Sequence, residues 1–367
     1  MSQVENTLKR NAQYGNEPTY ANGYVLDGTN EVAPLGHSVV IEITIENTVE
    51  RIRNTECSRL DGPLNADSWG AIKAGVDKVG WSANVKQLLH FGIFSYLMGK
   101  VTHSGSGPFN HKIEIADHPD VGEAFEQKSF VLLVDQAYLV ATKNDPRAIR
   151  YLMGCIPTSA EFRIDRAKNE VSANFTGFAN RMSMTSATPG ASPLFWDRSY
   201  FSDINNGIIG YAATVQFRKL EDGEDPYVYK IEATMVKVKL ESDTKGKRLG
   251  SVEINTILVG RLSIKMEMEF YNKASDFADH LIFNEILENN FLADDKSWDC
   301  QISLITAGGL VNISIDRLVP DGSTSGPTMS EAGAAMYSKK FTCGNLTIDE
   351  TNAYNQTKNG KLVMYSE

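Results

Sequence analysis

The sequence predicts a mainly β fold of the α+β class, built from two similar β-sandwich or barrel domains in tandem. Three observations predict it: long segments in which apolar and polar residues alternate, a polar stretch between two groups of such segments, and a matching order of elements in both groups. A chain of 367 residues also has the length of about two domains.

The first predicted domain covers residues 37–190 and follows an N-terminal arm, residues 1–36, which is polar and without sustained periodicity. Its opening strand is Ser38–Asn47, where Val and Ile alternate with polar residues that include Glu42 and Glu46. A short strand is expected at 79–85. Apolar residues then recur every three to four positions over 84–98, which predicts a helix that Gly99 would end.

The remainder of this domain is predicted as strands separated by turns. The strands are expected at 129–135, 160–165 and 170–178. Lys168 and Asn169 lie between the last two strands and predict a hairpin turn, and residues 103–111 have the composition of a loop. The Ser-, Thr- and Pro-containing stretch 184–193 predicts a domain boundary, with residues 191–232 as a connecting segment.

The second predicted domain covers residues 233–367 and repeats the pattern. Strands are expected at 233–243 and 261–271, and the polar face of the latter carries Glu267 and Glu269 as well as basic residues. A helix is expected at 275–289, with Ser275 as its N-cap. Further strands are expected at 298–309, 310–319 and 339–349.

The two groups of segments match in order and spacing. Strand 38–47 corresponds to 234–243, helix 84–98 to 275–289, and segment 154–165 to 338–349, which carries a cysteine and ends in Ile-Asp in both copies. Two copies separated by a linker predict a tandem duplication. The alternative is that two unrelated α+β domains share a strand-then-helix order.

Residue patterns typical of catalysis or cofactor binding are not found. The chain has no P-loop, no Gly-rich dinucleotide motif and no nucleophile elbow. The densest group of potential metal ligands has the spacing of no common site; it is His103, His111, Asp117 and His118. The four cysteines are far apart and predict buried free thiols; they are Cys57, Cys155, Cys300 and Cys343. We therefore expect no catalytic, metal-binding or cofactor-binding residues and no enzymatic activity.

Charge and hydropathy limit the possible partners. Lys and Arg number 36 against 46 Asp and Glu, which gives a net charge of −10. Because affinity for nucleic acid comes mostly from neutralising phosphates, this chain is not expected to bind DNA tightly. No secretory signal and no apolar run long enough to span a membrane is expected.

Three segments resemble the tail tube proteins of tailed bacteriophages: His37–Glu56, Gly75–Gly99 and Arg150–Phe178, with the theme repeated over Ala233–Asn352. The similarity extends over most of residues 37–352, although the simplest tube proteins have a single domain and about half this length. It implies two tube-like domains, each a β-sandwich or barrel flanked by a helix. It also implies a structural protein of the virion tail, assembled in the host cytoplasm.

The resemblance implies specific partners. Copies of the chain would form rings by pairing sheet edges, either three chains with pseudo-sixfold symmetry or six chains, and the rings would stack and meet other tail proteins. Viral DNA would pass through the lumen into the host without specific binding. Acidic residues on the lumen wall would repel phosphates, and the candidates are Glu42, Glu46, Glu267 and Glu269.

Two other functions stay open at the level of sequence. One is another tail or baseplate component of the same fold, or a related secretion tube. The other, of a different class, is a β-rich carbohydrate-active enzyme, which would need a deep pocket beside a pair of carboxylates.

Overall fold

The computed structural model describes residues 5–17, 20, 33–34, 41–49, 77–105, 109–116, 128–138, 147–187, 208–219, 227, 229–247, 254–271, 298–305, 309–321, 325–329 and 335–352. The predicted mainly β class is confirmed. The helical segments in these described ranges are the 3-10 turn η1 (Gly92–Phe94) and α1 (Ser95–Met98), which together have seven residues.

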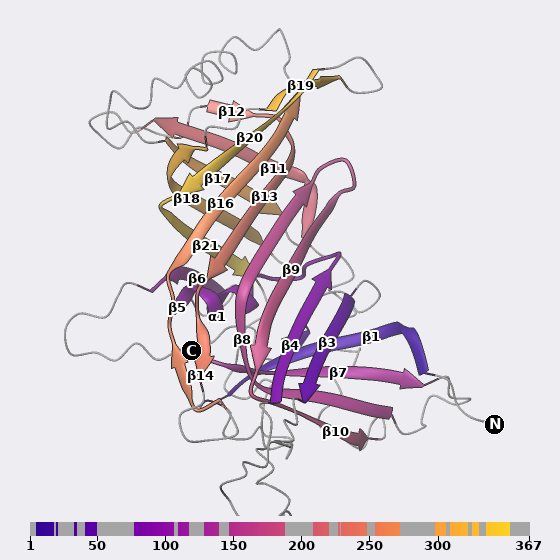
Figure 1. The fold of residues 1–367 in the computed structure, drawn as a ribbon. Helices are drawn as coiled ribbons and strands as arrows, with labels where there is room; N and C mark the ends of the chain where they lie inside the picture. Colours follow the sequence, from indigo (N-terminus) through magenta and orange to yellow (C-terminus); the bar gives the residue numbers. More distant parts are fainter. Residues whose placement is uncertain are drawn as a thin grey trace, which may run out of the picture.

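Strands make up the rest of the regular structure (Figure 1). The strands of the N-terminal half are β1 (Glu5–Asn16), β2 (Ala33–Pro34), β3 (Ile41–Val49), β4 (Asp77–Val85), β5 (Gly99–Ser104), β6 (Phe109–Ile115), β7 (Phe130–Tyr138), β8 (Arg147–Asp165), β9 (Glu170–Ala179) and β10 (Arg181–Ala187). Those of the C-terminal half are β11 (Ile209–Lys219), β12 (Tyr229–Ile231), β13 (Ala233–Ser242), β14 (Lys245–Lys247), β15 (Thr256–Leu258), β16 (Leu262–Tyr271), β17 (Trp298–Ile305), β18 (Leu310–Pro320), β19 (Ser325–Met329), β20 (Ala335–Cys343) and β21 (Asn345–Asn352).

A central sheet runs through both halves of the chain. Its antiparallel order is β3-β4-β9-β8-β13-β16-β20, and the pairing of β8 with β13 joins the halves. The outer side of β20 carries β19 and the end of β18. Its strands run side by side along the length of the molecule in Figure 1.

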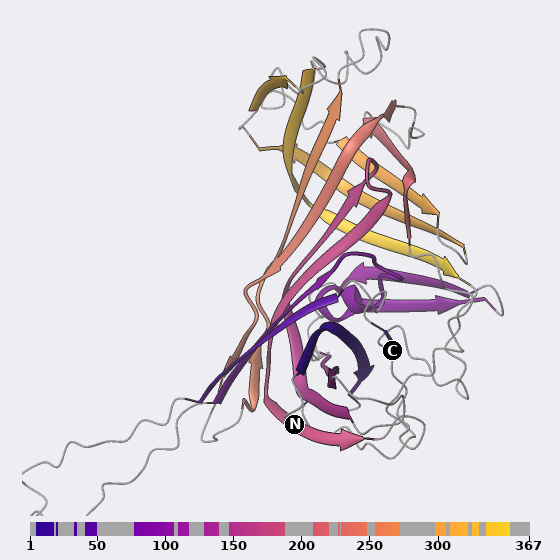
Figure 2. The same cartoon turned by 90° about the vertical axis from the view of Figure 1, so that its right-hand side faces the viewer.

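Two flanking sheets pack on one side of the central sheet, as Figure 2 shows. The first flanking sheet has the order β2-β1-β7-β8-β10 and the second β12-β11-β17-β18-β21-β6-β5. The long strand β8 is shared, because residues 147–155 pair in the first flanking sheet and residues 156–165 in the central sheet. One strand therefore bends from one sheet into the other.

Strands of the two halves pair in the same order. In the first half, β2-β1-β7-β8-β10 and β3-β4-β9-β8 share β8. In the second half, β12-β11-β17-β18-β21 and β13-β16-β20 meet in the same way at β18 and β19. The small β14–β15 hairpin lies in the chain between β13 and β16. Each half therefore contains a flanking sheet and part of the central sheet.

The bend of the long strand is built alike in both halves. Gly154 in β8 and Arg317 in β18 both have left-handed backbone, with φ of 65° and 55°. A proline follows three residues later in each strand, Pro157 and Pro320. Left-handed backbone favours glycine, so Arg317 is the less usual occupant.

The hydrophobic core fills the space between the central and flanking sheets. Trp81 of β4 packs edge-on against Phe130 of β7, with ring centroids 5.6 Å apart. Phe94, which η1 positions, lies between Phe162 and Phe175 of the central sheet at 5.7 and 5.2 Å. Burial of such aromatic side chains from both layers is what holds the layers together.

The described part of the predicted arm is a core strand. Residues 5–16 form β1, which pairs with β7, and Ala12 and Tyr14 are buried. The prediction failed because the apolar side chains of this strand are few and small, with Asn and Gln between them. Pairing along the edge of β7, and not hydrophobic periodicity, places this strand.

The predicted helix over 84–98 is corrected to a short helical turn. Val85 ends β4, and the amide of Leu88 donates to the carbonyl of Val171 at 2.7 Å while its carbonyl accepts from Ile208 at 3.0 Å. Because Leu88 bridges two strands, a helix can begin only after it. Gly99 does end α1 in left-handed backbone, as predicted, with φ of 92°.

Several strand predictions are confirmed and the connecting segment is not. The hairpin between β8 and β9 turns at Asn169, whose φ is 55°. By contrast, residues 184–187 continue β10, and β11 and β12 lie within the predicted connection 191–232 and bury Val215 and Phe217. The predicted helix 275–289 lies outside the described residues.

One of the three predicted internal correspondences is corrected. Segment 154–165 belongs to β8, whereas segment 338–349 covers the end of β20 and most of β21. Pairing order instead matches β8 with β18 and β19. The correspondence of strand 38–47 with strand 234–243 agrees with the equal positions of β3 and β13 in the central sheet.

Candidate functional site: the polar face of the central sheet

The face of the central sheet that points away from the flanking sheets is polar. Residues directly opposite each other across antiparallel strands lie on the same face, so the register defines it. One row runs from Asn174 of β9 through Glu161, Lys239 and Lys265 to Thr342 of β20. The alternate row of side chains is buried; it is Ala173, Phe162, Val238, Met266 and Phe341.

All four predicted lumen residues belong to this polar face by register. Glu267 and Glu269 are in β16, opposite Lys237 and Met235 of β13. At the other side of the sheet, Glu42 pairs in register with Asn84 and Glu46 with Gly80, and both partners continue the polar rows of β4. Sequence alternation had chosen these residues in two separate strands, and sheet pairing brings both strands into one surface.

Ion pairs between neighbouring strands cross this face. Lys237 Nζ lies 3.2 Å from Glu161 Oε2, which joins β13 to β8, and Lys340 Nζ lies 3.8 Å from Glu267 Oε1, which joins β20 to β16. The described charged side chains of the polar face include both signs in nearly equal number: Glu161, Arg163, Asp165, Glu170, Lys237, Lys239, Glu241, Lys265, Glu267, Glu269 and Lys340. The face is therefore mixed in charge.

Glu241 is held by two lysines. Its carboxylate lies 2.6 Å from Lys239 Nζ and 4.0 Å from Lys265 Nζ. A hydrogen bond with Lys239 lowers the pKa of Glu241, and the same bond raises the pKa of Lys239. Both groups therefore stay ionised at neutral pH, and neither is suited to exchange a proton with a substrate.

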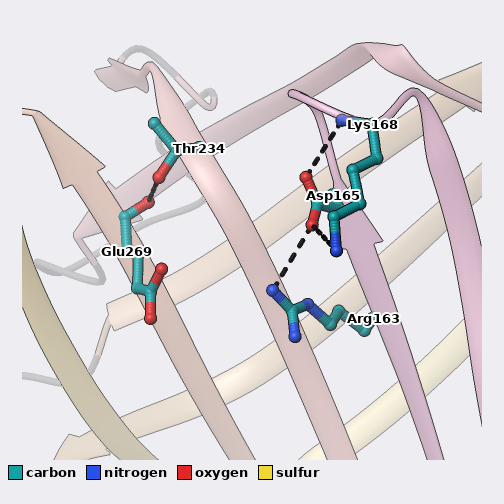
Figure 3. Close-up of polar contacts among 5 residues, drawn as sticks. All are labelled: Arg163, Asp165, Lys168, Thr234 and Glu269. Carbon is teal, nitrogen blue, oxygen red and sulfur yellow. Dashed lines mark hydrogen bonds and ion pairs between the residues drawn. The ribbon is translucent and has the colours of Figure 1, made fainter.

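One end of the face is shown in Figure 3, where Asp165 closes the β8–β9 hairpin. Its carboxylate accepts a hydrogen bond from the amide of Lys168 at 3.1 Å and lies 3.3 Å from the Arg163 guanidinium. The Thr234 hydroxyl donates to the backbone carbonyl of Glu269 at 3.0 Å, which leaves the Glu269 carboxylate pointing along the face (Figure 3). These contacts fix the hairpin and the strand end structurally.

Two members of the histidine group are brought together by the β5–β6 hairpin. His103 and His111 are directly opposite, with their Nδ1 atoms 2.8 Å apart. Asp117 and His118 lie outside the described residues. Within the described ranges, no group of three or more His, Cys, Asp or Glu side chains could hold a metal ion.

Three cysteines are free and buried, as the sequence predicts, and Cys57 lies outside the described residues. Burial raises the pKa of the Cys155 and Cys300 thiols far above the usual value and that of Cys343 to about 12. They are poor nucleophiles for that reason.

Sequence reasoning missed the residues that neutralise the acidic side chains. Arg163, Lys237 and Lys340 occupy polar positions of alternating strands that were themselves predicted, so the signal was present in each strand. What the sequence does not contain is the strand order, which places Lys237 beside Glu161 and Lys340 beside Glu267.

Comparison with known proteins adds no family: no protein-family model and no curated protein matches this chain. In the part of the chain that the structure describes, no helix has the length and apolar character needed to cross a membrane.

Proposed function

We propose that this chain is a structural subunit of a bacteriophage tail tube, which assembles into stacked rings around a channel for viral DNA. It acts by assembly and not by catalysis. Its partners are further copies of itself and other tail proteins, its place is the virion tail, and it is assembled in the host cytoplasm.

The observation that carries this proposal is the central sheet. It continues through both halves of the chain, packs one face on the flanking sheets and presents the other as a polar surface. Its two sides end in strands, β3 and β19, that each have one partner among the described strands. A sheet with two available edges and one solvated face is suited to close into a ring with its copies.

The matching strand order of the two halves favours a tandem duplication of one tube-like domain. Seven pairings recur in the same arrangement, and the long strand bends at Gly154 in one half and at Arg317 in the other. Two equivalent domains per chain favour a ring of three chains with pseudo-sixfold symmetry over a ring of six chains.

The mixed charge of the polar face supports passage of DNA without tight binding. Lysines on this face lie beside carboxylates, so they offer phosphates little uncompensated positive charge. Glu267 and Glu269, and Glu42 and Glu46 by register, add the negative charge that discourages adsorption of DNA. The resulting wall would act by paired charges more than by a uniform acidic field.

Electron microscopy of the purified full chain tests the proposal. We expect negatively stained rings and short tubes at micromolar concentration, and mass photometry is expected to show a discrete multiple of 40.5 kDa. Monomers or small irregular particles at every salt concentration, also after addition of purified tail tips as initiators, would contradict the proposal.

A further inference from the structure

The joint between the two halves is a continuous run of strand pairs. Seven consecutive residues of β13 face β8, from Met235 opposite Asp165 to Glu241 opposite Ser159. On the polar face, the ion pair between Lys237 and Glu161 crosses this joint at 3.2 Å. The first central strand of one half is therefore paired with the long strand of the other.

The outer strands of the central sheet are the counterparts of the strands in this joint. β3 holds the position of β13, because each is the first strand of its half in the central sheet. β19 holds the position of the C-terminal part of β8, because both pair with the strand that follows them, β20 or β9. Among the described strands, β3 pairs with β4 alone and β19 with β20 alone.

The bends of the long strands give the alignment of β19 with β8. Gly154 and Arg317, and likewise Pro157 and Pro320, are 163 residues apart. Pro157 faces Gly177 of β9, and Pro320 faces Phe341 of β20. Positions of β9 and β20 therefore correspond at a spacing of 164 residues.

Applied to the next pairs, this spacing matches Thr328 with Arg163. Arg163 faces Ser172 of β9, and Thr328 faces Met336 of β20, 164 residues beyond Ser172. The pairing of β19 shifts by one residue between Ser325 and Thr328. The joint is therefore best defined after this irregularity, which also contains Pro327, a residue without an amide hydrogen.

The alignment of β3 with β13 follows through β4 and β16. Trp81 of β4 faces Gly177, and Met266 of β16 faces Phe341, so these two positions correspond. Ile45 faces Trp81, and Val238 faces Met266. Ile45 therefore matches Val238, and the preceding residue Thr44 matches Lys237.

We propose that β3 of one copy pairs with β19 of the next copy in the register of the internal joint, with Thr44 opposite Thr328. This placement rests on the proposed ring and specifies its contact. Thr44 and Thr328 stand where Lys237 and Arg163 stand inside the chain. The occupant of each outer strand is thus a second copy of this chain, bound head to tail.

Chemically, the contact between copies differs from the internal joint. Ser325 faces Ser338 of β20 as Glu161 faces Asn174 of β9, so Ser325 is the counterpart of Glu161. The ion pair that crosses the internal joint is therefore replaced by the hydroxyl groups of Thr44 and Ser325. The contact between copies depends on backbone hydrogen bonds and buried apolar residues, and its strength is expected to vary little with salt.

Disulfide crosslinking tests the register in the full chain, with Cys57→Ser as the common background. The test variant carries Thr44→Cys and Thr328→Cys. Directly opposite residues of antiparallel strands have Cα atoms about 4.5–5.5 Å apart, which suits a disulfide. After mild oxidation we expect a covalent ladder that ends at the number of chains in the ring.

Two further variants serve as controls. Arg163→Cys with Lys237→Cys places the same pair at the internal joint and is expected to give a crosslink within one chain. Ile43→Cys with Thr328→Cys shifts the register by one residue and points the thiols to opposite faces, so it is expected to give less than a tenth of the crosslinked product.

The outcomes separate this inference from the proposed function. If microscopy shows rings, the internal pair crosslinks and the pair at positions 44 and 328 does not, the register is wrong while the ring stands. If microscopy and mass photometry show no ring, the proposed function fails and the inference fails with it. Efficient crosslinking by the shifted pair in rings would also overturn the register.

Discussion

Gly177 lies at the narrowest approach between two strands of the central sheet. A Cβ atom at this position would stand 2.2 Å from the carbonyl oxygen of Ile156 and 2.8 Å from the ring of Trp81. The first neighbour is backbone and cannot rotate away. Glycine is needed here for the close approach of backbone, not for unusual dihedral angles.

We expect Gly177→Ala to lower the free energy of unfolding by about 1–3 kcal/mol, the usual cost of forcing extra volume into a packed site. Chemical denaturation followed by tryptophan fluorescence measures it. Thr176→Ala is the matched control, because Thr176 is the exposed neighbour in the same strand. Equal stability of both variants would show that the strands can move apart at this point.

Burial of the cysteine thiols leads to a second prediction at this scale. Cys155, Cys300 and Cys343 are expected to resist iodoacetamide at pH 8 in the folded protein, since burial blocks access and raises the thiol pKa. Peptide mass spectrometry before and after denaturation gives the extent of labelling. Rapid labelling of any of the three in native protein would contradict their place in the core.

At the scale of elements, Asp299 connects three strands of the second flanking sheet. From β17, its carboxylate lies 2.9 Å from the guanidinium of Arg218 in β11 and accepts the amide hydrogen of Arg317 in β18 at 2.9 Å. Asp299 is buried, whereas Arg218 is about one quarter exposed. Arg218 also lies over the ring of Tyr227, at 4.7 Å.

Asp299→Ala is expected to cost about 3 kcal/mol of unfolding free energy, because it leaves a half-buried guanidinium and a strand amide without their acceptor. Arg218→Met is the companion variant and should cost clearly less, because it keeps the apolar stem over Tyr227. Thermal and urea denaturation of both variants give the comparison. A loss under 1 kcal/mol for Asp299→Ala would show that water replaces the carboxylate.

Element by element, alternation predicted most central strands, and local chemistry explains where it failed. β13 and β16 were found because one face is consistently apolar. The helix over 84–98 was predicted because nearly every side chain from Leu88 to Met98 is buried, and dense burial mimics helical spacing. Lys339 shows the opposite problem: it is buried in β20, where alternation of residue types gives no reason to place a lysine.

The polar face could be predicted as a set of strand faces but not as one surface. Glu267 and Glu46 were chosen separately, and only the pairing of β8 with β13 puts their strands in the same sheet. That pairing links segments about 75 residues apart, and such long-range contacts leave no local signal in the sequence. The neutralising lysines went unrecognised for the same reason.

For the whole molecule, the proposed channel makes a prediction about DNA. Tubes carrying Glu267→Lys and Glu269→Lys are expected to retain DNA in a gel-shift assay at low salt, whereas unchanged tubes let it migrate freely. The matched control carries the same charge change on exposed residues of β5, Thr102→Lys and Ser104→Lys. Equal retention by both variants would place the polar face outside the channel.

The shared strand β8 has a mechanical consequence. Because residues 147–155 pair in one sheet and residues 156–165 in another, the sheets are connected by covalent bonds and not by packing alone. A pull on the central sheet is therefore transmitted along the backbone into the flanking sheet, where many hydrogen bonds must shear together. A wall made of such subunits would stiffen when stretched around its circumference, with the bend at Gly154 as the point that yields first.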